Sequence, residues 1–297
     1  MEIKEKKPRG QALAEFKQFI WNPRTREFLG RTGSSWALIL LFYLVFYAFL
    51  TALFSLTMWV MLQTIDEYTP KYTDRLSNPG LMIRPKTDSL DIVYNVSDSS
   101  SWNASVSALN NFLLSYNDSN QADNNVPCNF TSGYNLQDDS GDVRNHPKTA
   151  CQFNRSLLAS CSGDDDPTYG YSRGTPCVLI KMNRVINFRP EPLFTNQTYV
   201  TVNCSAPKSA DGLLATYFPS SSSADANSYG ILSLKYFPYY GKKAQTNYTQ
   251  PIVAVQFSNL TMNTDYNIKC AIYAKNIKFE TRDNFAGRVN FKLRVNQ

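Results

Sequence analysis

The stretch that decides the fold runs from Trp36 to Leu62 and reads WALILLFYLVFYAFLTALFSLTMWVML. It carries no charge, and the charge-free segment around it extends from Thr32 to Ile65. As a helix it would be about 40 Å long, which is enough to cross a hydrocarbon core of about 30 Å. A buried core helix rarely needs so long an apolar run. We therefore expect one membrane-spanning helix.

The charges that flank this segment predict its orientation. Residues 14–31 contain four Lys or Arg residues, whereas residues 64–83 contain two. The positive-inside rule therefore places the N-terminus in the cytosol. A cleaved signal peptide is disfavoured because the apolar run is about twice the length of a signal h-region and no small-residue cleavage site follows it. We expect a cytosolic tail over residues 1–35, the span over 36–62 and an extracellular domain over 63–297.

The composition outside the span excludes several classes of function. The net charge is +6, but residues 1–31 hold eight Lys or Arg residues against four acidic residues, which leaves 22 against 20 in the rest. This balance excludes a nucleic-acid binder driven by counterion release. The sequence has one histidine and no phosphate-binding loop, dinucleotide fingerprint, nucleophile elbow or H-E-x-x-H motif. We therefore expect no catalytic residue, no metal site and no cofactor.

The cysteines and the glycosylation sequons all lie beyond the span. An even number of cysteines in a segment placed outside the cell predicts three disulfides, and the absence of a C-x2-C pair disfavours zinc. Sequence alone does not select a pairing, although chain order is the simplest. The cysteines are Cys128, Cys151, Cys161, Cys177, Cys204 and Cys270. The nine sequons are at Asn95, Asn103, Asn117, Asn129, Asn154, Asn196, Asn203, Asn247 and Asn259. Since Asn203 precedes a cysteine expected to be bridged and buried, we expect its sequon to stay unused.

The outer segment divides into an irregular part and a strand-rich part. Residues 63–175 are rich in turn and polar residues, and the helical spacing of their apolar residues predicts one amphipathic helix near 101–116. From residue 176 to 297 the apolar period becomes two. The runs are CVLIKMNRVINF, TYVTVNC, ILSLKYF, IVAVQF, YNIKCAIY and GRVNFKLRV. Short antiparallel strands with a long-range disulfide predict an immunoglobulin-like sandwich that lacks the Trp of antibody domains.

Two stretches carry a family resemblance. The first is F-x-x-F-x-W-N at residues 16–22, followed by L-G-R-T at 29–32 and by Trp36. The second is K-x-x-C-Q at 148–152, followed by L-x-x-C-S-G at 158–163. Together with KMNRVINF (181–188) and YFPYYGKK (236–243), they resemble the β subunits of the potassium-counter-transporting P-type ATPases, which are the sodium pump and the gastric proton pump. The resemblance covers the whole chain.

The resemblance implies a type II single-pass glycoprotein of the plasma membrane with an immunoglobulin-like ectodomain. It implies disulfides in chain order, which are Cys128–Cys151, Cys161–Cys177 and Cys204–Cys270. It also implies a non-catalytic subunit that pairs with a multi-span catalytic α subunit, which hydrolyses ATP. The β chain allows α to fold, leave the endoplasmic reticulum and reach the cell surface, and it adjusts the affinity for external potassium. Membrane lipid and a small single-span regulatory subunit are the other expected partners.

Two segments are the candidate contacts with the α subunit. In the span, Tyr43 and Tyr47 lie on one helix face near a stripe of small residues, which permits close helix approach. Outside, the YFPYYGKK segment combines aromatic residues, a proline and two cations, as interface centres do. Within it we expect Tyr236 in the core and Tyr239, Tyr240 and Lys243 at the interface. The alternatives are that the span tyrosines face lipid and that the outer rings are buried at a strand end.

Two other functions compete with the sodium-pump interpretation. The gastric proton-pump β subunit carries a tyrosine-based endocytic signal in its tail, and here the corresponding aromatic residue is Phe19, which lacks the hydroxyl that the signal needs. The sequence therefore looks more like a sodium-pump β subunit, in particular the more heavily glycosylated non-β1 types. A cell-adhesion glycoprotein would suit the sequons and the sandwich, but adhesion alone would not require the aromatic tail motif or the tyrosine pair.

Overall fold

The chain separates at Ile65 into two units. The computed structural model describes residues 16–73, 78–87, 89–129, 133–140, 143–206, 213–221, 228–279 and 283–297. Its contacts divide the chain into Met1–Ile65 and Asp66–Gln297. Residues 1–15 of the expected cytosolic tail lie outside the described residues.

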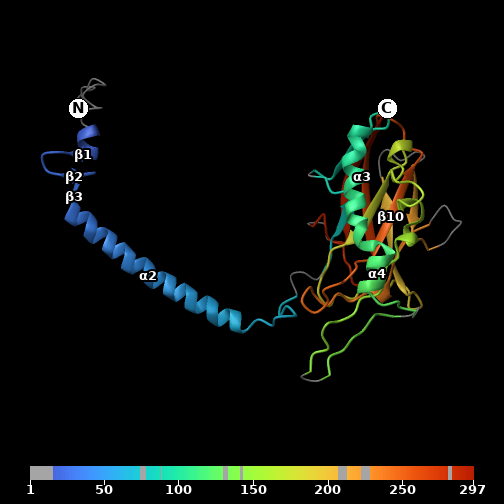
Figure 1. Cartoon of the computed structure of the whole chain (residues 1–297), viewed down its shortest axis with the longest axis horizontal. Helices are drawn as coiled ribbons and strands as arrows, with labels where there is room; N and C mark the ends of the chain where they lie inside the picture. The colour runs from blue at the N-terminus through green and yellow to red at the C-terminus, as the bar shows by residue number, and fades with distance from the viewer. Residues whose placement is uncertain are drawn as a thin grey trace. The chain divides into compact units, whose positions relative to one another are not determined.

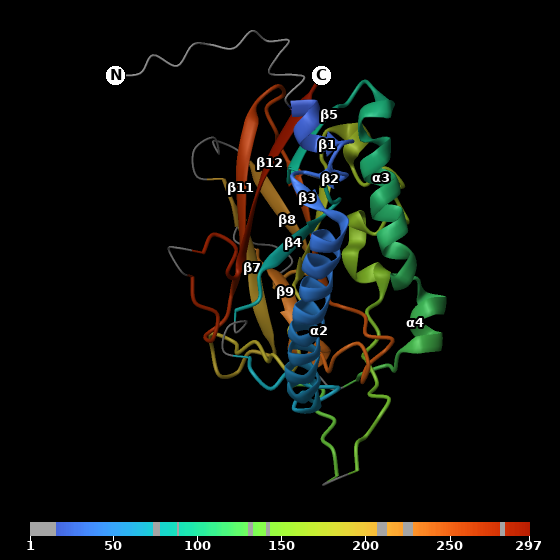
Figure 2. The same ribbon diagram turned by 90° about the vertical axis from the view of Figure 1, so that its left-hand side faces the viewer.

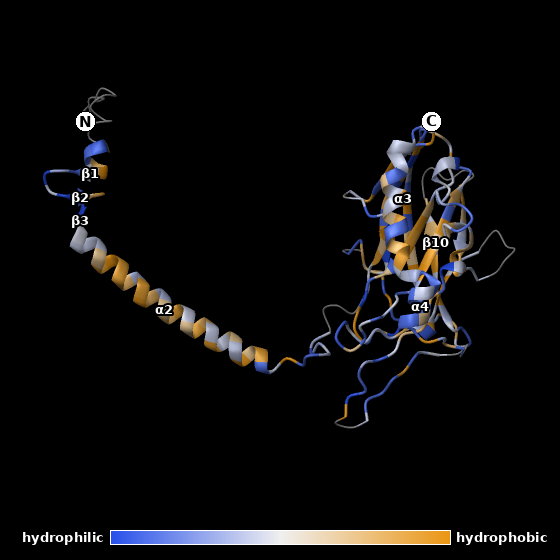
Figure 3. Ribbon diagram, in the orientation of Figure 1, coloured by the Kyte–Doolittle hydropathy of each residue, from blue (hydrophilic) through white to orange (hydrophobic). Residues whose placement is uncertain are grey.

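Helix α2 (Gly33–Gln63) dominates the first unit and exceeds the predicted span at both ends. No side chain on it is buried, and its surface is apolar along most of its length (Figure 3). Among the described residues it is the one helix that is long and apolar enough to cross a membrane. The prediction of a single N-terminal apolar helix is therefore confirmed.

A small folded segment precedes α2. Strands β1 (Trp21–Asn22), β2 (Glu27–Phe28) and β3 (Arg31–Thr32) form an antiparallel sheet. Gly30 has a φ of 72° in the turn between β2 and β3, a conformation that glycine adopts at little cost. The indole N–H of Trp36 donates to the Phe28 carbonyl at 2.8 Å, so the first turn of α2 is tied to this sheet.

The second unit is built on two sheets. The four-stranded sheet has the order β4 (Leu81–Arg84), β6 (Cys177–Met182), β10 (Ile252–Ser258), β8 (Leu214–Phe218). The five-stranded sheet has the order β5 (Asp91–Asn95), β12 (Arg288–Asn296), β11 (Asp265–Tyr273), β7 (Tyr199–Ser205), β9 (Gly230–Ser233). Neighbouring strands are antiparallel except β5 and β12, which are parallel. The unit is therefore mainly β, as predicted.

Alternating apolar residues join the two sheets through one core. On β12, Val289, Phe291, Leu293 and Val295 are buried, as their alternation predicts. The Phe291 ring lies 6.2 Å from the ring of Phe257 on β10, which belongs to the other sheet. The two sheets thus bury their facing sides against each other.

Helix α3 (Ser99–Leu113) lies along the outer face of the four-stranded sheet (Figures 1 and 2). It begins after Asp98, whose carboxylate accepts from the Ser100 N–H at 2.9 Å and so caps the helix. A 3-10 turn, η2 (Leu114–Tyr116), and helix α4 (Asp118–Asn124) follow. The buried residues of α3 and η2 are the four whose spacing predicted this helix: Val106, Leu109, Leu113 and Tyr116.

The strand predictions were incomplete in several places. Strands β4 and β5 lie in the part predicted to be irregular, and β8 was not predicted at all. These strands are four or five residues long, which is too short for a clear period-two pattern. The run 177–188 is a strand only as far as Met182, and a left-handed Asn187 (φ 60°) interrupts any extension. The run 231–237 becomes the 3-10 turn η5 (Leu234–Tyr236) after Ser233.

The six cysteines form three disulfides in chain order, as the family resemblance implies. Cys204 and Cys270 face each other directly across β7 and β11, so their bond lies within the five-stranded sheet. It does not join the two sheets, as the disulfide of antibody domains does.

We expect the Cys204→Ser/Cys270→Ser variant to lose more stability than the Cys128→Ser/Cys151→Ser variant. The first bond closes a separation of 66 residues and the second one of 23. The chain-entropy model then predicts that the free energy of unfolding falls by about 4 kcal/mol in the first variant and by about 3 kcal/mol in the second. Thermal unfolding of the full-length variants in detergent measures the difference. Equal midpoints would contradict it, and the paired substitutions avoid leaving a reactive free thiol.

Candidate subunit-contact surfaces

The two tyrosines predicted to contact a partner within the membrane form a stacked pair on α2. The rings of Tyr43 and Tyr47 are 5.9 Å apart with an interplanar angle of 20°. Their side chains are 48% and 59% exposed. No hydrogen bond engages either hydroxyl within the described residues, so both can reach a neighbouring helix.

The YFPYYGKK segment divides between core and surface. Tyr236 and Phe237 are buried, and burial raises the pKa of Tyr236 to about 12. Tyr239 and Tyr240 are half-buried, whereas Lys243 is exposed. Tyr236 thus lies in the core, as expected. The interface role of Tyr239, Tyr240 and Lys243 stays a prediction, and each of these side chains also has partners within the chain.

Tyr240 fixes the loop that begins at residue 133. Its hydroxyl accepts from the Gln137 N–H at 2.8 Å and donates to the Asn135 carbonyl at 3.3 Å. The Lys148 ammonium lies 4.8 Å from the centre of its ring and donates to the Asp139 carboxylate at 2.7 Å. The Lys148 hydrogen bond holds the pKa of Asp139 below its usual range. One aromatic side chain therefore organises a loop about 100 residues away in the sequence.

Tyr239 packs on a second tyrosine. Its ring centre is 4.8 Å from that of Tyr248, and the Arg184 guanidinium lies 5.6 and 5.7 Å from the two ring centres. The Tyr248 hydroxyl donates to the Tyr236 carbonyl at 3.0 Å, and burial raises its pKa. Tyr239 is thus backed by a second tyrosine ring, while its own side chain stays half-buried.

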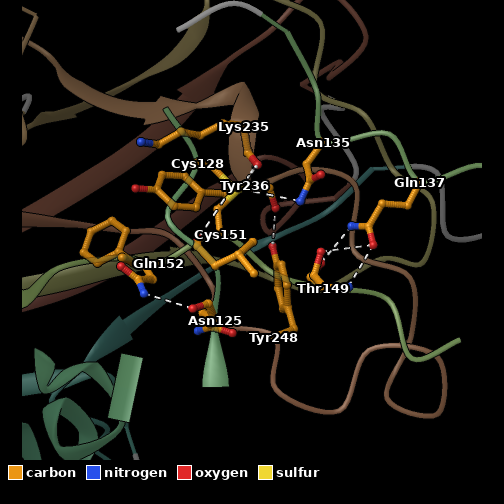
Figure 4. The surroundings of a disulfide bond; sticks show 12 residues. Asn125, Cys128, Asn135, Gln137, Thr149, Cys151, Gln152, Lys235, Tyr236 and Tyr248 are labelled. Atoms are coloured by element: carbon orange, nitrogen blue, oxygen red, sulfur yellow. Dashed lines mark hydrogen bonds between the residues drawn. A yellow bond between two sulfur atoms is a disulfide. The ribbon is translucent and has the colours of Figure 1, made fainter. Parts of the chain in front are cut away.

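A disulfide lies beside the start of the same segment. Figure 4 shows Tyr236 and Lys235 beside Cys128–Cys151. The Asn135 amide donates to the Cys151 sulfur at 3.5 Å. The segment therefore rests on a cross-linked part of the unit.

Residues 66–68 contact residues 144–146 and Lys243. The sequence did not predict these contacts. Arg144 donates to the Asp66 carboxylate at 2.6 Å and holds the pKa of that carboxyl well below its usual range. The Tyr68 ring stacks on His146 with centres 4.4 Å apart. Lys243 forms an ion pair with Glu67. No local pattern signals these pairs, because their members are about 80 to 180 residues apart.

The sequons differ in exposure. Asn203 lies in β7, is half-buried, and accepts from the Tyr217 hydroxyl at 2.9 Å, which opposes glycan attachment. Asn95 and Asn117 are also half-buried. The exposed sequons are at Asn103, Asn129, Asn154, Asn196, Asn247 and Asn259.

The described residues around these surfaces include no candidate metal centre. Within the described ranges, no group of three or more His, Cys, Asp or Glu side chains is placed to hold a metal ion. The arrangement offers aromatic edges, amides and cations, which suit protein recognition.

We expect Tyr240→Phe to loosen the loop over residues 133–149 by about 1 kcal/mol, because the variant loses both hydroxyl hydrogen bonds. That loss corresponds to roughly fivefold more frequent opening. The measurement is the rate of tryptic cleavage at Arg144 and Lys148 in the full-length protein. Tyr229→Phe, on the five-stranded side, is the matched control and should cleave like wild type. An unchanged rate in Tyr240→Phe would show that the hydroxyl does not hold the loop.

Comparison with known proteins identifies the family. The family model described as the sodium / potassium ATPase beta chain matches residues 6–291. Sodium/potassium-transporting ATPase subunit beta-2 from Mus musculus is 57% identical over 99% of this chain and 98% of its own length. The subunit of the same name from Rhinella marina is 55% identical over 99% of both chains. Potassium-transporting ATPase subunit beta from Rattus norvegicus is 39% identical over 99% of this chain and 98% of its own length. The chain belongs to the sodium/potassium ATPase beta chain family.

Proposed function

We propose that this chain is the non-catalytic β subunit of a sodium/potassium-transporting ATPase. It pairs with the catalytic α subunit, supports the folding and surface delivery of α, and adjusts the potassium affinity of the pump. The observation that carries this proposal is the family match over residues 6–291, which include α2 and nearly all of the second unit. A gastric-type role is less well supported, because identity to the potassium-transporting subunit is 39% against 55–57% for the beta-2 subunits.

The proposed topology follows from the charges around α2. The N-terminus lies in the cytosol, and Asp66–Gln297 forms an extracellular, glycosylated domain of the plasma membrane with an immunoglobulin-like arrangement of its two sheets. Its disulfides and its exposed sequons support that placement. We assign the glycans to the exposed sequons and expect Asn203 to stay unmodified.

We further propose that α is contacted at two places. Within the membrane, the contact is the face of α2 that carries Tyr43 and Tyr47. Outside, it is the half-exposed edges of Tyr239 and Tyr240, which Tyr236 supports from the core. Lys243 then acts chiefly through Glu67, by holding the residues next to the membrane. Lipid surrounds the rest of α2, and a small regulatory subunit is a further expected partner.

Co-precipitation with a catalytic α subunit tests the outer contact. If Tyr239 and Tyr240 lie at a desolvated interface centre, each Ala substitution costs about 2 kcal/mol or more, and the double variant should recover little α. Tyr229→Ala/Tyr273→Ala removes two exposed rings elsewhere and should recover α normally. Tyr240→Phe separates loop anchoring from partner contact, because it keeps the ring. Full recovery with Tyr239→Ala/Tyr240→Ala would contradict the proposed contact.

The contact within the membrane has a different expected signature. Tyr43→Phe/Tyr47→Phe should leave assembly intact, because ring volume survives and a hydrogen bond between membrane helices averages about 0.6 kcal/mol. It should shift the potassium dependence of pump current. Tyr43→Ala/Tyr47→Ala, which removes the packing surface as well, should reduce assembly. Wild-type potassium titrations for both variants would show that this face lies against lipid.

A further inference from the structure

A polar cavity of about 410 Å³ lies between helix α4, the η2 turn and the segment 246–250. Lys181 of β6 and Arg184, which follows that strand, reach it from the four-stranded sheet. The other walls are amides, hydroxyls and aromatic rings, among them Asn124, Thr246, Gln250, Phe112 and Tyr248. The cavity shares Arg184 and Tyr248 with the stack behind Tyr239, but Tyr239 and Tyr240 themselves do not line it.

The cations at this cavity lack acidic partners. Within the described part of the chain, no carboxylate forms an ion pair with Lys181, Arg184 or the nearby Arg84. Arg184 makes one long side-chain hydrogen bond, from its Nε to the Gln250 Oε1 at 3.4 Å. Among the residues that the structure describes, no hydrogen bond engages the Lys181 ammonium. Half-buried positive charges such as those of Lys181 and Arg84 are usually paired, so an external anion fits this cluster.

The surroundings concentrate this positive charge. Arg84 and Lys181 lie 5.3 and 5.7 Å from the centre of the Phe112 ring, so both cations share one aromatic side chain. Burial lowers the pKa of the Lys181 ammonium, and the neighbouring Arg84 and Arg184 lower it further. A bound anion would offset the repulsion among these cations and compensate for the lost hydration of Lys181.

The size and lining of the cavity distinguish an acidic sugar from a bare anion. A sulfate ion would occupy only part of the volume, whereas a saccharide ring would extend to the amides and hydroxyls of the walls. The partly exposed Phe112 and Tyr248 rings offer surfaces on which the C–H face of a sugar packs. We propose that this cavity binds the carboxylate of an acidic sugar, with Lys181 and Arg184 as the anion-binding residues.

The sugar can come from two sources. Asn247 lines the cavity and is an exposed sequon, so a glycan attached there can supply the acidic residue itself. A glycan on another molecule presents the same chemistry. Removing the sequon by Asn247→Gln distinguishes these two sources, because a glycan attached to Asn247 would compete with any added probe.

The test is equilibrium dialysis of radiolabelled methyl α-N-acetylneuraminate against the full-length chain co-purified with α. The methyl ester of the same sugar is the neutral control probe, and inorganic sulfate is the competing bare anion. We expect the acid to bind and the ester to bind at least about tenfold more weakly. Binding that tightens in Asn247→Gln assigns the ligand to the chain's own glycan, and unchanged binding assigns it to another molecule.

Substitutions of the two cations test whether the acidic sugar binds in this cavity. Lys181→Gln and Arg184→Gln should each raise the dissociation constant about tenfold, because each removes a charge-assisted contact. Lys269→Gln changes another half-buried strand lysine, on the five-stranded sheet, and should bind like wild type. Arg184 is exposed, so its loss does not endanger the fold.

Four outcomes would overturn the proposal. The first is equal affinity for the acid and the ester. The second is that the acid binds neither wild type nor Asn247→Gln, and the third is that sulfate binds as tightly as the acid. The fourth is loss of α from the Lys181→Gln preparation, which would place the cations at the subunit interface.

Discussion

The second unit depends on the burial of its two sheets against each other. The Phe257–Phe291 contact joins strands from different sheets, and apolar residues of β6, β10, β11 and β12 enclose it. Sheets of four and five strands hold no stable shape as isolated layers, because each exposes one apolar face. The stacked rings of Tyr239 and Tyr248 and the helix α3 keep their positions because this core is closely packed.

The YFPYYGKK segment shows how one stretch of sequence serves two roles. Its buried half joins the core, and its half-buried rings anchor the loop at 133–149 and stack on Tyr248. The same side chains leave edges toward solvent. A ring whose inner edge is held by hydrogen bonds loses little further freedom when a partner covers its outer edge, and this pre-organisation favours binding.

The sequence predicted the elements whose signal is local. The charge-free run gave α2, the helical spacing from Val106 to Tyr116 gave α3, and the alternation from Val289 to Val295 gave β12. The short strands β4, β5 and β8 were missed, because only their long-range pairing makes them strands. The Lys243–Glu67 and Arg144–Asp66 pairs were also missed, because they too join residues far apart in the sequence. Chemistry identifies such residues as charged or aromatic, but only the fold brings them together.

The parallel pairing of β5 with β12 has a consequence for biosynthesis. Asp91 is aligned with Lys292, so an early strand waits for a partner made about 200 residues later. At translation rates of about 5–20 residues per second, that delay is about 10 to 40 s. During it, β5 presents an unpaired edge to which another chain can pair. A nascent chain with this topology therefore needs its β5 edge shielded, and the rate of chain elongation sets how long that shielding must last.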